Sequence, residues 1–186
     1  GAPLVATGKD PRQDAATEYA PTRTFYGVTA VAHFSATPDR DGTRRVEIAF
    51  DDPLAVETVT LAGRRFPLAA DFTVPLAVML AREDPKKLEL ARLLRPEKYA
   101  QTAHVTRLQP YDPNKTVVIV THGLADSPAT WTPMLNTLRG DPVIRNHFQF
   151  WFYSYPSGYP YPYSAAIMRR ELDGIEKHFP LSKKVV

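Results

Sequence analysis

The sequence predicts an α/β protein in which a β-rich segment with two short helices precedes a half-sheet of alternating parallel strands and helices. Two observations carry this prediction. Apolar and more polar residues alternate with a period of two between residues 26 and 50, as in strands with one buried face. Later, the continuous apolar runs Val117–Val120 and Phe148–Tyr153 are separated by a helical pattern, which is typical of parallel strands covered on both faces.

The first 110 residues divide into a lead-in and a β-rich accessory region. Residues 1–23 carry no clear periodicity, so we expect a loosely held lead-in. Within residues 24–110, the alternation of Tyr26–Phe34 resumes in Val46–Phe50 after a turn, which predicts a β-hairpin. A second strand pair is predicted over Val56–Leu61 and Arg65–Leu68.

Prolines mark the next elements. We predict two short helices between residues 73 and 95, because Pro75 suits the first turn of one and Asp84-Pro85 can cap and begin the other. A further strand is predicted over Ala103–Leu108. The loop signal of Pro110–Asn114 then places a domain boundary near residue 110.

Residues 111–186 are predicted to be the amino-terminal half of an α/β domain that the given residues leave incomplete. Thr132-Pro133 begins a helix between the two apolar strands, and Gly140 with Pro142 ends it. Helical spacing returns from Met168 to Phe179. Lys183–Val186 is expected to open a third parallel strand.

Composition excludes several classes of function. The 23 basic and 20 acidic side chains are scattered along the chain, whereas nucleic-acid binding needs a concentrated basic face, so we predict no nucleic-acid partner. With no cysteine there is no thiolate nucleophile, zinc ribbon or Fe–S cluster, and we predict neither a metal nor a cofactor. No apolar run reaches the roughly 18–20 residues that cross a bilayer. Localisation stays open between the cell envelope and the cytoplasm.

The stretch TVVIVTHGLADSPATW, residues 116–131, joins an apolar strand through His122-Gly123-Leu124 to a helix start. It resembles the oxyanion loop of the α/β-hydrolases, a family that includes bacterial lipases and esterases. Further landmarks of the resemblance, which covers residues 66–186, are Phe66-Pro67-Leu68-Ala69-Ala70-Asp71-Phe72-Thr73, Leu94-Arg95-Pro96-Glu97-Lys98-Tyr99, Tyr111-Asp112-Pro113, Ser127-Pro128, Phe150-Trp151-Phe152 and Tyr155-Pro156.

The resemblance implies a partial α/β-hydrolase fold and a serine hydrolase that cleaves carboxylic or lipid esters through an acyl-enzyme. The Leu124 N–H would stabilise the oxyanion, with His122 and Gly123 shaping a loop that follows a central parallel strand. Relatives continue beyond the position of Val186 into a Gly-His-Ser-Met-Gly-Gly nucleophile elbow. We therefore expect the nucleophile, acid and base to lie outside these residues, and this fragment alone to be inactive. The alternative is a noncatalytic binding or partner-docking module.

Four further residues are candidates for substrate binding. Asp126 and Ser127 follow the loop directly, although loop and helix-cap chemistry accounts for both residue types equally well. Tyr155 and Tyr159 belong to a Tyr/Pro-rich segment after the second apolar strand, where open α/β sheets place substrate. A proline-rich ligand for a partner protein is the less favoured interpretation of this segment.

Overall fold

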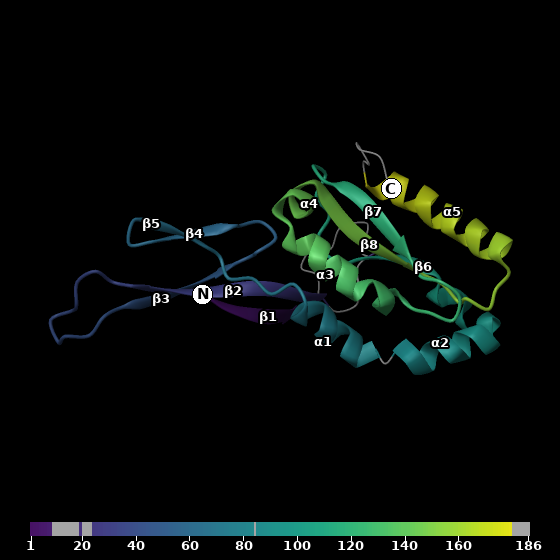
Figure 1. Ribbon diagram of the computed structural model, residues 1–186, viewed down its shortest axis with the longest axis horizontal. Helices are drawn as coiled ribbons and strands as arrows, with labels where there is room; N and C mark the ends of the chain where they lie inside the picture. Colours follow the sequence, from purple (N-terminus) through teal and green to yellow (C-terminus); the bar gives the residue numbers. More distant parts are fainter. Residues whose placement is uncertain (9–18, 20–23, 84, 180–186) are drawn as a thin grey trace.

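A computed structural model describes residues 1–8, 19, 24–83 and 85–179. Its strands form three sheets: an antiparallel sheet in the order β1-β2-β3, the hairpin β4-β5, and a mixed sheet in the order β6-β8-β7. Figure 1 shows the first two sheets extending as an arm from a body that contains the mixed sheet and the later helices.

The arm contains β1 (Ala2–Gly8), β2 (Thr24–Phe34) and β3 (Val46–Asp51). The hairpin of β2 and β3 is confirmed, with Ala32 opposite Ile48 in the antiparallel register. β1 was not predicted, because residues 2–8 do not alternate clearly; it pairs antiparallel with β2. Alternation places Thr29 and Val31, both buried, on the face that turns toward residues 69–76.

The second predicted strand pair is also confirmed, as β4 (Thr58–Leu61) and β5 (Arg64–Pro67). Ala62 and Gly63 both have positive φ, as the two central residues of a type I′ hairpin turn require. The two predicted helices follow as α1 (Val74–Glu83) and α2 (Pro85–Leu94). A 3-10 segment, η2 (Pro96–Thr102), then leads to β6 (His104–Arg107).

The body alternates strands and helices. Its elements are β7 (Thr116–Thr121), η3 (Pro128–Trp131), α3 (Thr132–Gly140), α4 (Pro142–His147), β8 (Phe148–Ser154) and α5 (Tyr161–His178). The short helix α4 was not predicted: Asp141 caps it by accepting hydrogen bonds from the Val143 and Ile144 N–H groups. The end predicted from Gly140 and Pro142 is confirmed, because α3 ends at Gly140, and Pro142 also occupies the first turn of α4.

The predicted fold class is wrong. The described chain is a small mixed domain with antiparallel sheets, not a parallel strand–helix half of an α/β-hydrolase fold. Among the described strands, only β7 and β8 run parallel, and β6 is antiparallel to β8. The connections explain the directions: helices α3 and α4 form a crossover between β7 and β8, whereas residues 108–115 contain no helix and return the chain in the opposite direction.

The mixed sheet is covered on both faces, as its apolar strands predicted. On one face, Trp151 and Tyr153 of β8 pack with Ile175 of α5 and with Phe179, which follows α5 directly. On the other face, side chains of β7 and β8 pack against α1, η3 and α3. The strands contribute Val120, Phe150 and Phe152, and the helices contribute Leu76, Trp131 and Leu135. Successive side chains of β8 therefore serve two different cores.

Two expectations concerned features outside this core. The strand expected at Lys183–Val186 lies outside the described residues. Within the described part of the chain, no helix is long and apolar enough to cross a membrane.

Candidate functional site

The candidate loop lies where the parallel strands β7 and β8 both end. Residues 122–127 follow β7, and residues 155–158 follow β8, so the two segments meet at the same edge of the sheet. Among the described strands β8 is central and β7 is at the edge, so the expectation that the loop follows a central strand is wrong. The neighbouring segment after β8 is therefore what braces the loop.

His122 is locked into this junction. His122 is 3% exposed, and its ring stacks on the Tyr155 ring with centroids 4.5 Å apart. Nε2 lies 3.3 Å from the Tyr155 N–H and must accept from it, which leaves Nδ1 protonated to donate to the Gly123 carbonyl at 3.0 Å. The Tyr155 hydroxyl donates in turn to the His122 carbonyl at 3.1 Å.

Burial lowers the pKa of His122 from 6.5, and the hydrogen bond to Gly123 opposes this shift. The neutral tautomer therefore holds the loop. A second proton would have to enter on Nε2, which already faces an N–H group. This arrangement suits a shaping residue and not a general base.

Leu124 and Ala125 differ in what their backbone N–H groups do. The Ala125 N–H donates to the Ser157 hydroxyl at 3.0 Å, and Ala125 adopts a left-handed conformation with φ of 53°. Leu124 precedes it with its side chain turned outward, 61% exposed. No described residue accepts a hydrogen bond from the Leu124 N–H. The Leu124 N–H is thus unpaired among the described residues, in a loop that Tyr155 and Ser157 brace.

Asp126 and Ser127 close the loop as helix-cap chemistry predicts. Asp126 Oδ1 accepts from the Ser127 N–H at 2.8 Å, and Ser127 Oγ accepts from the Ala129 N–H at 3.3 Å at the start of η3. Ser127 is buried, and among the described residues no histidine or carboxylate forms a hydrogen bond with its hydroxyl. Trp131 ties η3 back to β7 by donating from Nε1 to the Thr121 carbonyl.

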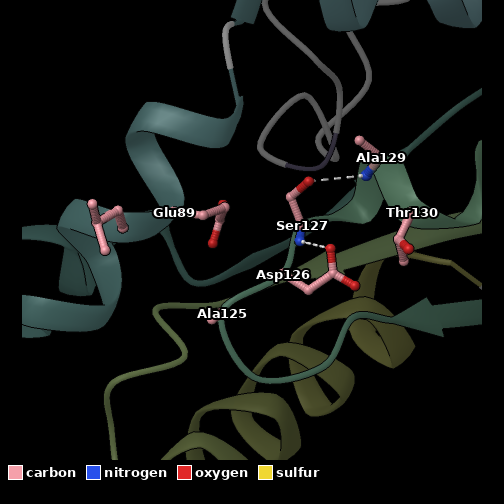
Figure 2. A pocket seen from close by; sticks show the side chains of 7 residues that line it. Glu89, Ala125, Asp126, Ser127, Ala129 and Thr130 are labelled. Atoms are coloured by element: carbon pink, nitrogen blue, oxygen red, sulfur yellow. Dashed lines mark hydrogen bonds between the residues drawn. The ribbon is translucent and has the colours of Figure 1, made fainter.

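A cavity of about 540 Å³ opens beside the loop. Figure 2 shows Asp126, Ser127 and Thr130 on one side of it and Glu89 of α2 opposite them. The full lining is Glu89, Leu90, Ala125, Asp126, Ser127, Ala129 and Thr130. The structure therefore brings Asp126 and Ser127 to a cavity, together with two polar residues that sequence reasoning did not single out, Glu89 and Thr130.

Glu89 is buried against Arg92, 2.8 Å from Oε1 to Nη1. Arg92 also donates to the Ser154 hydroxyl at the end of β8. Glu89 Oε2 is buried and has no hydrogen-bond partner among the described residues. The sequence carries no local signal for this site, because a Glu–Arg pair at i,i+3 on a helix ordinarily lies on a solvated face.

The two candidate tyrosines occupy different places. Tyr155 is buried and braces His122, and Tyr159 pairs with the Tyr163 ring at 4.7 Å. Neither lines the cavity beside the loop. Burial raises the pKa of Tyr155, so its hydroxyl remains a donor at neutral pH. Burial likewise raises the pKa of Tyr153 to about 12.

No group of three His, Asp or Glu side chains within the described ranges could hold a metal ion. Comparisons of the chain with protein-family models, with curated proteins and with solved structures gave no match.

Proposed function

We propose that the loop His122–Ser127 supplies the Leu124 N–H to the oxyanion that forms when a serine hydrolase cleaves a carboxylic or lipid ester. One observation carries the proposal: the Leu124 N–H has no acceptor among the described residues, while the loop around it is fixed by Tyr155 and Ser157. A donor held in place before the reaction stabilises developing charge without reorganisation.

The chemistry requires groups that this loop does not contain. A serine hydroxyl, deprotonated by a base, attacks the ester carbonyl carbon, and the carbonyl oxygen becomes the oxyanion. Collapse of this intermediate expels the alcohol and leaves an acyl-enzyme, which water hydrolyses in a second attack. The Leu124 N–H would contribute about 10²- to 10³-fold in rate, as single oxyanion donors typically do.

The proposal places the nucleophile, acid and base outside these 186 residues. No Gly-x-Ser-x-Gly elbow occurs in the sequence. Ser127 Oγ is committed to the Ala129 N–H, and both ring nitrogens of His122 are committed to the backbone. The encoded sequence after Val186 gives a direct check, since an elbow within about ten residues supports the enzyme and a stop codon or replaced serine opposes it.

The donor itself can be tested by amide NMR with ethyl butylphosphonate, a stable anionic analogue of the tetrahedral intermediate. We expect the Leu124 amide resonance to move saturably on titration. Leu124→Pro removes the N–H and should weaken binding about tenfold or more, whereas Leu124→Ala keeps the N–H and trims only an exposed side chain. Equal binding by both variants would refute the assignment.

A second candidate function, a noncatalytic docking module, is favoured by the uncovered face of the arm. Phe34, Ile48 and Phe50 are 66%, 58% and 65% exposed and lie on one face, opposite the face that carries Thr29 and Val31. Every residue of β1, β2 and β3 on this face is uncharged. An apolar face of this kind is typical of an association surface.

A second copy of the chain is the occupant this face fits. Two identical uncharged faces can pack without burying an unpaired charge, and each covers the other's apolar side chains. Sedimentation velocity over a concentration series should therefore show dimers that Ile48→Thr weakens. Glu47→Gln, on the opposite face of the same strand, is the matched control. A monomer at all concentrations would exclude this candidate.

A further inference from the structure

We infer that Glu89 makes the cavity beside the loop a binding site for an ammonium group, so that the substrate is an ester carrying a protonated amine. The identification of this ligand as a substrate rests on the proposed function. The juxtaposition that carries it is a buried carboxylate oxygen without a partner in the described part of the chain, set across a cavity of about 540 Å³ from a second carboxylate.

Glu89 is held in a fixed position by only one of its oxygens. Oε1 pairs with Arg92 Nη1 at 2.8 Å, and the side chains of Glu89 and Arg92 are 8% and 3% exposed. Oε2 is buried, and no described group donates to it. A buried carboxylate oxygen that lacks a donor is costly to the fold, even where the other oxygen of the group is paired. A ligand that reaches Oε2, by a shift of the side chains that cover it, donates to this oxygen and removes the cost, which is why the unpaired oxygen points to a ligand.

The position of Glu89 agrees with this role. Figure 2 shows its side chain extending from α2 toward the turn that contains Asp126 and Ser127. Arg92 anchors it from behind by donating to the Ser154 hydroxyl at 3.0 Å, at the end of β8. The carboxylate is therefore positioned by the same strand end that braces the candidate loop.

The charges around the cavity select a cation. Glu89 and Arg92 neutralise each other, and Asp126 adds a negative charge on the opposite wall. Asp126 Oδ1 accepts from the Ser127 N–H, and no described residue donates to its Oδ2. No lysine or arginine is among the lining residues of the described chain. Both carboxylates attract an ammonium group in the cavity, and both repel an anion.

Three probes of equal length separate the alternatives: n-butylammonium, n-butanol and n-butyrate. We expect the native chain to bind n-butylammonium at least about tenfold more tightly than either other probe, since bonds between charged partners are the stronger ones. Carbon-13 labelling of glutamate carboxyl groups gives a direct readout. The Glu89 carboxyl resonance, assigned with Glu89→Asp, should move as n-butylammonium saturates the site.

Variants then locate the binding. Glu89→Gln should weaken n-butylammonium binding about tenfold or more, while Glu176→Gln, an exposed carboxylate on α5, should leave it unchanged. Because Glu89→Gln also leaves Arg92 without its partner and could impair folding, the carboxyl resonance of the native chain decides in that case. A stationary Glu89 resonance at saturation, or n-butanol binding as tightly, would overturn the inference.

The two proposals fail separately. Ethyl butylphosphonate reports on the Leu124 amide, and n-butylammonium reports on the Glu89 carboxyl group. Loss of the first response with the second intact would reject the oxyanion loop but keep a cation site. The reverse result would keep the oxyanion loop and reject the ammonium substrate.

Discussion

Replacing His122 with phenylalanine should destabilise the chain by roughly 2–3 kcal/mol. Phenylalanine keeps a ring against Tyr155 but removes both nitrogens, so the buried Tyr155 N–H loses its acceptor and the Gly123 carbonyl loses its donor. An orphaned buried N–H costs about 1–3 kcal/mol, and a lost bond at the exposed Gly123 costs about 1 kcal/mol or less. Tyr155→Phe removes only the hydroxyl bond to the His122 carbonyl and should cost about 1 kcal/mol.

Urea unfolding followed by tryptophan fluorescence measures these differences in the free energy of unfolding. Repeating the measurement at several pH values tests the protonation state of His122. Because burial places the folded pKa of His122 below 6.5, the unfolded chain binds more protons below that pH. The free energy of unfolding contributed by His122 is therefore intact above about pH 6.5 and falls as the pH drops toward the folded pKa. For this one group the slope cannot exceed about 1.4 kcal/mol per pH unit.

The phenylalanine variant cannot titrate at this position, so its unfolding free energy should vary less between about pH 7 and pH 5 than that of the native chain. The native chain and the variant share every other titratable group, and subtracting their pH profiles isolates His122. A variant within about 0.5 kcal/mol of the native chain, or one with an unchanged pH profile, would refute the assigned tautomer and its two hydrogen bonds.

Three further outcomes are expected. Activated short-chain esters and a fluorophosphonate probe should show neither turnover nor labelling, because Ser127 is a buried cap; stoichiometric labelling of Ser127 would contradict this. Glu57→Gln should cost about 0.5–1 kcal/mol in a denaturant titration, since it weakens a half-exposed ion pair to Arg145, and Glu47→Gln should cost less. In the monomeric chain, Ile48→Thr should lower binding of a hydrophobic dye without lowering the melting temperature, because this side chain is 58% exposed; unchanged dye binding would place the dye elsewhere.

Local patterns were sufficient for most of the individual elements. Alternation predicted the hairpin of β2 and β3, because one face of it is buried and the strand period is two. Proline positions predicted α1 and α2, and continuous apolar runs predicted β7 and β8 with cover on both faces. Each of these signals lies within a single element, where neighbouring residues alone determine the pattern.

The direction of each strand and its neighbours in the sheet cannot be predicted from such local patterns. A strand near residues 103–108 was expected from its composition, and β6 occupies His104–Arg107. Its antiparallel pairing with β8 places Arg107 opposite Trp151, a partner that no local pattern identifies. The short helix-free connection to β7 was the available clue, because a parallel neighbour would have needed a longer crossover.

The candidate site likewise has one part that local sequence patterns predict and one part that depends on long-range contacts. His122, Gly123 and Leu124 were predicted to form the turn after a strand, and they do, because a strand end followed by glycine and a cap is a local signal. Glu89 could not be predicted, since its role depends on Arg92 reaching Ser154 from a different element. Long-range polar contacts of this kind leave no periodic trace in a sequence.

The bracing of the loop follows from the order of the strands. Because β8 lies beside β7 and runs parallel to it, the residues after β8 emerge next to the loop, and Tyr155 and Ser157 hold it from that side. The braces bond to His122 and Ala125, on either side of Leu124, and leave the Leu124 N–H without an acceptor in the described part of the chain. A loop fixed at both flanks cannot easily turn that N–H toward a backbone acceptor. The order of the strands therefore accounts for the unpaired Leu124 N–H. Loosening either brace should let this N–H change its orientation before the packing of the hydrophobic core changes.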